Sequence, residues 1–156
     1  MDRKEAKAVL SVVAASSGYS CKGALAWNGG VEIVRMLQYQ SSRWGSGTYV
    51  NFGIIPLALI PRSVPPGVAH WGYHGRAESL LEPFQDVFIR FALNEVSVSP
   101  DELEAALRWL FTWLDGVFAN EPNIRRDVLD ASSWLHSSGP VTLTFKAWAR
   151  GETVAR

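Results

Sequence analysis

Residues 48–55 read TYVNFGII, the most β-like run in the chain, because β-branched and aromatic side chains dominate it. An earlier run over residues 19–27 alternates with a period of two, which places on one side Tyr19, Cys21, Leu25 and Trp27. Asn28-Gly29 follows, and this pair favours a type I′ hairpin turn, in which both central residues need positive φ. A return strand over residues 31–40 and a Ser/Gly-rich turn over 41–47 then lead into the TYVNFGII run. The sequence therefore predicts a three-stranded antiparallel meander.

A helix is predicted before the meander, over residues 2–17. Asp2 and Glu5 are three positions apart, as in a capping box, where each side chain bonds the other residue's backbone N–H. Gly18 suits the left-handed conformation that ends many helices. One face of this helix is apolar, at Ala6, Val9, Leu10 and Val13.

A longer helix is predicted over residues 100–118. The segment Ser99-Pro100-Asp101-Glu102 supplies an N-cap serine, a proline at the first helical position and acidic residues in the first turn. We expect its core-facing stripe to consist of Leu103, Leu107, Leu110, Leu114 and Val117.

The other elements rest on shorter patterns. Four prolines make residues 56–68 extended and irregular, since proline donates no ladder hydrogen bond. Val87–Leu93 is predicted to be a fourth strand, with a helix over residues 78–93 as the alternative. Another helix is predicted over residues 123–136, with its apolar face at Ile124, Val128, Ala131 and Leu135. Gly139-Pro140 should end that helix, and the alternation over Val141–Trp148 predicts a last strand.

These elements follow the order α-β-β-β-β-α-α-β, without a repeated β-α alternation. Strands grouped before helices are typical of an α+β fold. We expect an antiparallel sheet, made of the meander and two later strands, with helices packed mainly on one face. The chain has 156 residues, of which 47% are hydrophobic and 19% charged, which fits a single domain over residues 1–156.

Composition excludes several classes of function. Fifteen basic residues balance fifteen acidic ones, so there is no global positive field for nucleic acid, and basic residues do not interleave with the aromatic ones. Cys21 is the single cysteine, which excludes an internal disulfide framework and a cysteine-rich zinc module. Apolar stretches are too short to span a bilayer, and the acidic N-terminus does not read as a signal peptide. We expect a cytoplasmic protein that binds neither membrane nor nucleic acid.

Charge is divided unevenly along the chain. Residues 1–78 hold eight Lys and Arg against four Asp and Glu, whereas residues 79–156 hold seven against eleven. The excess concentrates in residues 82–130, with ten acidic and four basic residues. Helix starts attract acidic residues and account for such a gradient by themselves. The alternative is a docking face for a basic partner.

No catalytic, cofactor or metal motif is evident. His70 and His74 have the i, i+4 spacing of a helical zinc pair, but Gly72 and the preceding prolines argue against a helix there. We therefore predict no metal site and assign no catalytic residue. His70, His74 and Arg76 form an alternative ligand site, because histidine titrates near neutral pH and arginine clamps anions.

Seven tryptophans are the unusual feature of the composition. Trp109 lies about 130° around its helix from the leucine stripe, so either another element of the chain or a partner covers it. Trp44 stands beside Arg43 in a Ser/Gly turn, and Trp and Arg are common anchors of protein interfaces. Glu104 and Asp115 fall on the predicted solvent face of the long helix. The predicted partner-binding residues are thus Arg43, Trp44, Glu104, Trp109 and Asp115.

The stretch from Gly18 to Glu78 resembles small bacterial proteins of the domain of unknown function 4304 family. The resemblance rests on residues 18–22 (GYSCK), 36–41 (MLQYQS) and 49–54 (YVNFGI), and on His70-Trp71 with Arg76. It implies a small α+β protein without assigned catalytic residues. By analogy, such proteins accompany bacterial polymorphic toxins, where small cytoplasmic proteins serve as immunity partners.

Two functional hypotheses follow. The first is a non-catalytic protein-binding module, most concretely a bacterial immunity protein that binds and occludes a cognate toxin. The alternative is a small-molecule or anion-binding protein, or an enzyme, that uses the segment from His70 to Arg76. The sequence does not fix the oligomeric state.

Overall fold

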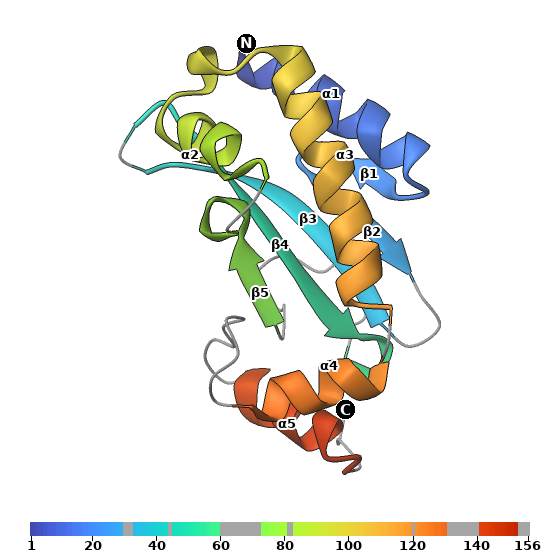
Figure 1. Cartoon of the computed structure of the whole chain (residues 1–156). Helices are drawn as coiled ribbons and strands as arrows, with labels where there is room; N and C mark the ends of the chain where they lie inside the picture. The colour runs from blue at the N-terminus through green and yellow to red at the C-terminus, as the bar shows by residue number, and fades with distance from the viewer. Residues whose placement is uncertain are drawn as a thin grey trace.

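The computed structural model describes residues 1–29, 33–43, 45–59, 73–80, 83–119, 121–130 and 141–152. Five strands form one antiparallel sheet in the order β1-β2-β3-β4-β5, so every strand pairs with its neighbour in the chain (Figure 1). The strands are β1 (Ser20–Lys22), β2 (Leu25–Gly29), β3 (Ile33–Ser41), β4 (Thr48–Pro56) and β5 (Tyr73–Arg76). The predicted antiparallel α+β architecture is confirmed.

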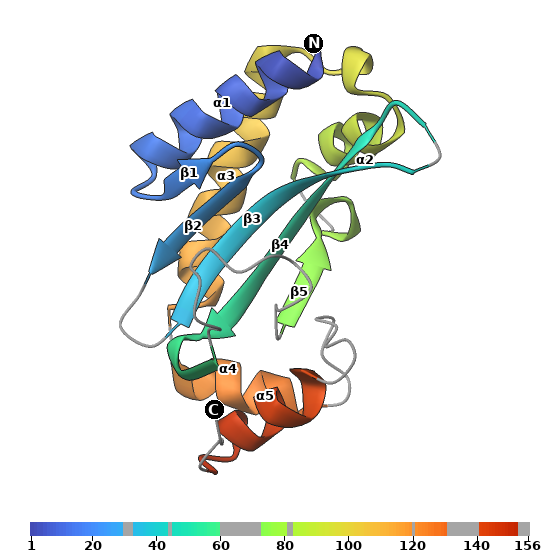
Figure 2. The ribbon, with the colours of Figure 1, turned by 180° about the vertical axis from the view of Figure 1, so that it is seen from behind.

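Three helices cover one face of this sheet, and two more pack together beyond the end of β4 (Figures 1 and 2). The covering helices are α1 (Arg3–Ser16), α2 (Gln85–Leu93) and α3 (Pro100–Val117), and the other two are α4 (Glu121–Leu129) and α5 (Val141–Ala149). Short 3₁₀ turns at Leu57–Leu59, Ala77–Ser79 and Glu95–Ser97 join the longer elements. Within the described ranges, no helix combines the length and the apolar character needed to cross a membrane.

The predicted capping box of α1 is present, and the predicted N-cap serine of α3 also forms one. Asp2 Oδ1 accepts from the backbone N–H of Glu5 at 2.8 Å, while Glu5 Oε2 accepts from the N–H of Asp2 at 2.7 Å. Ser99 and Glu102 make the same reciprocal pair at the start of α3. These bonds satisfy N–H groups that have no partner inside a helix, so they fix where α1 and α3 begin. Gly18 adopts φ +78°, as predicted for the residue that ends α1.

The core lies between the sheet and the three covering helices. Leu10 and Val13 of α1 and the leucine stripe of α3 are fully buried there against alternate residues of β3 and β4, including Leu37 and Phe52. Val117 does not belong to this core, because its side chain is 38% exposed. On the other face of the sheet, a smaller buried cluster forms around Val34, Met36 and Ile55.

The first hairpin differs from the prediction. The turn between β1 and β2 includes Gly23, which has φ +64°, so the predicted strand over residues 19–27 is two strands. Asn28 and Gly29 are not turn residues, because they pair with Arg35 and Val34 in the ladder between β2 and β3. Cys21 and Ala26 pack toward the helices, whereas Leu25 and Trp27 pack on the other face, so the predicted single apolar side is wrong.

Two predicted strands are helices. Val87–Leu93 belongs to α2, as in the alternative prediction, because Val87, Phe88 and Phe91 have the spacing that buries one helix face. Val141–Trp148 belongs to α5, where Phe145, Trp148 and Ala149 are buried at helical spacing. Part of the predicted irregular segment 56–68 and much of the helix predicted over 123–136 lie outside the described residues. Ile124 and Val128 of α4 are buried as predicted.

Candidate protein-interaction surface

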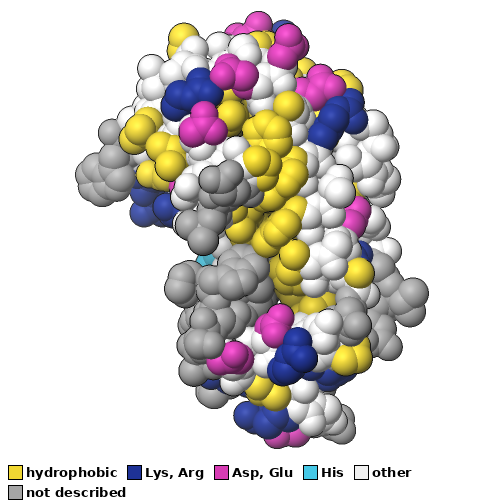
Figure 3. Space-filling view, viewed as in Figure 1, with side chains coloured by type: hydrophobic (Ala, Val, Ile, Leu, Met, Phe, Trp, Pro, Cys, Tyr) yellow, Lys and Arg dark blue, Asp and Glu magenta, His cyan; other side chains and the backbone are white. Residues whose placement is uncertain are grey.

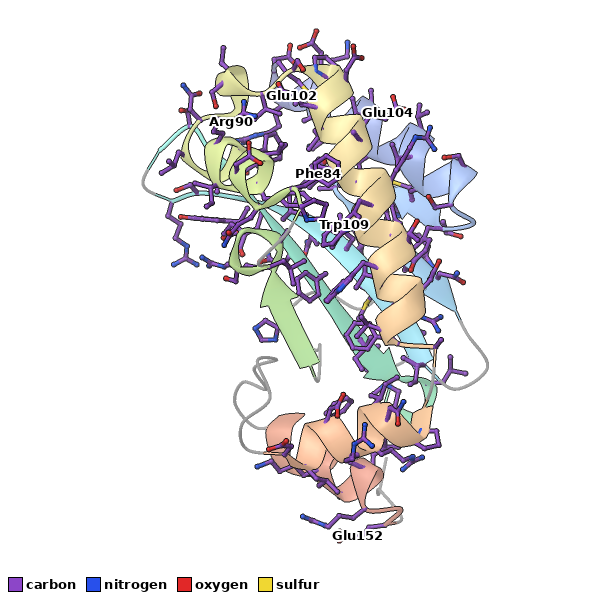
Figure 4. All side chains as sticks on the ribbon, in the orientation of Figure 1. Phe84, Arg90, Glu102, Glu104, Trp109 and Glu152 are labelled. Carbon is purple, nitrogen blue, oxygen red and sulfur yellow. The ribbon has the colours of Figure 1, made fainter. Side chains whose placement is uncertain are left out.

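A row of aromatic rings runs along the flank of α3 that faces α2. The rings of Trp109 and Trp113, one turn apart, stack at 6.1 Å with an interplanar angle of 22°. Phe84, the N-cap residue of α2, lies 6.2 Å from Trp109, and Figure 4 shows these two side chains meeting between the helices. We call Phe84, Trp109 and Trp113 the aromatic row. All three side chains are only partly buried.

The position of the aromatic row follows from the periodicity of α3. The leucine stripe points into the core, and Trp109 and Trp113 come next around the helix, at the edge of the covered face. The ring of Phe52, from β4, lies 5.3 Å from that of Trp113 and packs against it edge-to-face. For Trp109, the structure shows cover by another element of the chain in part, because Phe84 at the start of α2 packs against a ring that is only partly buried.

A second apolar feature lies at the C-terminal end of α2. Three aliphatic side chains are exposed there: Ile89 by 41%, Leu93 by 73% and Val96 by 72%. We call these residues the aliphatic patch. Figure 3 shows apolar side chains gathered along α3 and over α2 on one face of the molecule. Exposed aliphatic side chains that gather with large aromatic ones are more informative than scattered ones, since they mark interaction sites.

The turn between β3 and β4 rests against the same end of α2. Gly47 approaches so closely that a Cβ at this position would lie 1.8 Å from the carbonyl oxygen of Ala92. Ser46 Oγ also lies 3.5 Å from Asn94 Oδ1, and Arg43, in the same turn, is exposed. Trp44, the other predicted anchor in this turn, lies outside the described residues.

Glu104 and Asp115 are engaged within the chain. Glu104 Oε1 accepts from Nε and from an Nη of Arg108 at 2.9 and 2.8 Å, and Arg108 also donates to Ser16 Oγ of α1. Asp115 Oδ1 accepts from the hydroxyl of Tyr19 at 2.8 Å and lies 3.8 Å from Nε of Arg35. Asp115 therefore links α3 to Tyr19 and to Arg35 of β3, while its side chain remains 45% exposed.

A third ion-pair group borders the aliphatic patch. Arg90 lies 2.7 Å from Glu102 and 3.5 Å from Asp86, and it donates to the backbone oxygen of Ser97. The hydrogen bond from Arg90, together with those from Ser99, holds the pKa of Glu102 at about 2. Despite these pairs, residues 83–119 hold six acidic residues and two basic ones, so this part of the chain remains acidic.

The alternative ligand site falls on the opposite face of the sheet. Arg76 lies 4.2 Å from the ring centroid of Tyr49 and 3.8 Å from the carboxylate of Glu78. His74 pairs with Gly53 in the β4–β5 ladder, so the predicted loop is a strand from Tyr73 onward. Strand alternation puts His74 and Arg76 on one face of β5. His70 lies outside the described residues, and within the described ranges no three His, Cys, Asp or Glu side chains are grouped as metal ligands.

Sequence reasoning identified Trp109 but missed Phe84, Leu93 and Val96. No local pattern points to Phe84, because its contact with Trp109 of α3 comes from tertiary packing. The sequence predicts a strand over Val87–Leu93, and a strand gives no reason to expect Leu93 exposed at the end of a helix. Comparison with protein-family models, curated proteins and solved structures finds no match.

Proposed function

We propose that this protein is a protein-binding module that docks a partner on the face formed by α2 and α3. The observation that carries this proposal is the aromatic row, whose three side chains are only partly buried. Figure 3 shows apolar side chains along α3 and over α2 on one face of the molecule. Tryptophan and phenylalanine are enriched at interfaces, and Trp is among the residues that most often carry binding energy.

The arrangement fits the anatomy of an interface. Partly exposed rings on a rigid helix lose little conformational entropy when a partner covers them, because packing against Phe52 and Phe84 already restrains them. Exposed Leu93 and Val96 add apolar area that water leaves when a partner binds. The ion pairs of Arg90 with Asp86 and Glu102 add polar groups that link α2 to the first turn of α3.

The acidic excess of residues 83–119 favours a partner with a basic surface. In its most concrete form, the partner is a cognate bacterial toxin, and the protein is a cytoplasmic immunity protein that occludes it. The resemblance to the domain of unknown function 4304 family and the analogy with toxin-immunity pairs support this finer proposal.

The test uses co-expression with the products of adjacent genes, followed by purification and growth assays. We expect a stoichiometric complex and protection from a toxic neighbour. Leu93→Ser should weaken the complex, because it removes apolar contact area at a side chain that is 73% exposed and therefore contributes little to the fold. Val12→Ser is the matched control, since Val12 is 60% exposed on α1, outside the proposed surface.

Equal affinity of the Leu93→Ser and Val12→Ser variants would place the interface elsewhere on the molecule. Absence of both a stoichiometric partner and any protection would contradict the immunity function. The alternative ligand site has less support, because Arg76 already contacts Tyr49 and Glu78.

A further inference from the structure

A small pocket lies between the N-terminal half of α1 and the ends of β3 and β4. Its volume is about 110 Å³, and residues of both α1 and the sheet line it. Ala6, Tyr39 and Thr48 are buried, whereas Arg3, Lys7 and Ser41 are exposed. The pocket shares no residue with the aromatic row or the aliphatic patch, so it is independent of the proposed docking surface.

Two cationic side chains line the α1 side of the pocket. Arg3 and Lys7 are four residues apart, so they project from the same side of the helix. Lys7 makes no ion pair within the described residues. Arg3 has another contact, but a guanidinium carries five N–H donors and can serve two partners.

Three hydroxyl groups line the opposite side. Ser41 and Thr48 are directly paired across β3 and β4, and Tyr39 lies two residues before Ser41 on the same face of β3. The pocket therefore combines two positive charges with hydroxyl donors that come from different elements.

The hydroxyl of Tyr39 is the unusual member of this group. Tyr39 is 6% exposed, and its Oη is buried without a hydrogen-bond partner in the described part of the chain. Buried polar atoms almost always find a partner, so an unpaired phenol beside a cationic pocket indicates a missing acceptor. Burial also raises the pKa of Tyr39, which keeps the phenol protonated and able to donate.

We propose that this pocket binds a phosphate group, either as free phosphate or as the phosphate of a small ester. A cavity needs roughly 10–15 Å³ of volume to hold one water molecule. The pocket volume of about 110 Å³ therefore accommodates one phosphate group and excludes a large ligand. Donors on two opposing walls suit a tetrahedral anion, whose oxygens point in several directions, better than a planar carboxylate. Hydrogen bonds from charged donors to such an oxyanion are the strong ones.

The experiment is calorimetric titration of the purified chain with inorganic phosphate, methyl phosphate and acetate at constant ionic strength. We expect saturable binding of phosphate or methyl phosphate, and the tighter of the two distinguishes the free ion from the ester. Saturable binding of neither compound, or binding of acetate as tight as that of phosphate, would overturn the proposal.

Two lysine variants test whether phosphate binds in the pocket. Lys7→Gln removes one charge and should weaken phosphate binding about tenfold. Lys4→Gln is the matched control on the same helix, outside the pocket, and should bind as the parent does. Equal effects of the two lysine changes would show a general charge effect and contradict the site.

Tyr39→Phe tests the phenol separately. It keeps the ring that meets Phe91 edge-on at 5.5 Å, so the variant should fold. Because the hydroxyl has no partner in the free protein, its removal should leave the phosphate-free melting temperature unchanged or raise it. Phosphate affinity should fall several-fold, and an unchanged affinity would exclude Tyr39 from the site and overturn its proposed role as the donor.

Discussion

The hydroxyl of Tyr19 donates a hydrogen bond of 2.8 Å to Oδ1 of Asp115, which ties the residue after Gly18 to the last turn of α3. The ring of Tyr19 lies 4.5 Å from that of Phe111, so apolar packing accompanies the hydrogen bond. The pKa of Tyr19 is raised above its ordinary value, mainly by burial and to a smaller extent by the hydrogen bond to Asp115. The phenol therefore stays protonated and remains a donor at any physiological pH.

This relationship predicts a measurable coupling. Tyr19→Phe should lower the free energy of unfolding by about 1 kcal/mol, because one hydrogen bond to a charged acceptor is lost while the ring stays. Asp115→Ala should cost at least as much, since it also removes the carboxylate beside Arg35. Urea denaturation of the single and double variants gives the coupling energy, which we expect to exceed about 0.5 kcal/mol. Strictly additive effects would show that the bond contributes nothing to stability.

The close approach of Gly47 to α2 predicts a steric effect. Gly47→Ala should destabilise the protein by about 1–3 kcal/mol, because the new Cβ would overlap the carbonyl oxygen of Ala92 and force the backbone to move. Gly45→Ala is the control in the same turn, where a Cβ meets nothing within 4 Å. Comparable denaturation midpoints for the two variants would mean that the turn does not rest on α2.

The N-cap of α3 predicts a loss of stability on truncation. Ser99→Ala should cost about 1 kcal/mol, because the Oγ that accepts from the backbone N–H of Glu102 is removed. Ser99→Asp keeps an acceptor at the cap and should retain most of the stability of the parent. An unchanged midpoint for Ser99→Ala in chemical denaturation would contradict this start of the helix.

The ion pair of Glu102 and Arg90 predicts a pH dependence. The folded-state pKa of Glu102, at about 2, lies below the ordinary value of 4.5, so its stabilising effect is fully present above about pH 4.5 and is lost as pH falls toward 2. Glu102→Gln should therefore reduce stability at neutral pH and flatten the decline over this acid range. Arg90→Gln should flatten it too, because the hydrogen bond from Arg90 is the largest cause of the lowered pKa. Thermal melts across this pH range provide the measurement.

The proposed docking surface predicts two different kinetic effects on partner binding. Glu104→Lys should slow association and weaken its salt dependence, because it reduces the acidic field that steers a basic partner. Trp109→Ala should instead speed dissociation. If Trp109 is an anchor of the interface, the binding free energy should weaken by about 2 kcal/mol. Both rates are measured at two salt concentrations, after circular dichroism confirms folding. Parent-like rates for both variants would place the interface away from α3.

The parts of the fold that could be predicted from sequence are those with local causes. The starts of α1 and α3 follow from side chains that bond backbone groups three residues away, at Asp2 with Glu5 and Ser99 with Glu102. The strand over residues 48–55 was also predicted, because β-branched and aromatic residues there pack on both faces of a central strand.

The parts that could not be predicted depend on tertiary contacts. The segment Val141–Trp148 is compatible with a strand and with a helix. It alternates as a strand does, but Phe145 and Trp148 are also three residues apart, as on one face of a helix. Packing of α5 against α4 decides in favour of the helix. Asn28-Gly29 has the composition of a tight turn, but pairing with Arg35 and Val34 extends β2 through it. At the proposed surface, Trp109 could be found from its angle on the helix, whereas Phe84 and Leu93 required the packing of α2.

The strand order of the sheet has a consequence for the order in which the chain acquires structure. Each strand joins the one made just before it, so the sheet can grow hairpin by hairpin during synthesis, without waiting for distant segments. The contact of α1 with α3 is different, because it joins residues about ninety positions apart and cannot form until α3 has been made. A nascent chain that stops before Ser99 should therefore carry a formed sheet whose apolar face is covered only by α1 and α2. The part that α3 covers in the complete fold should bind hydrophobic dyes and chaperones until α3 is added.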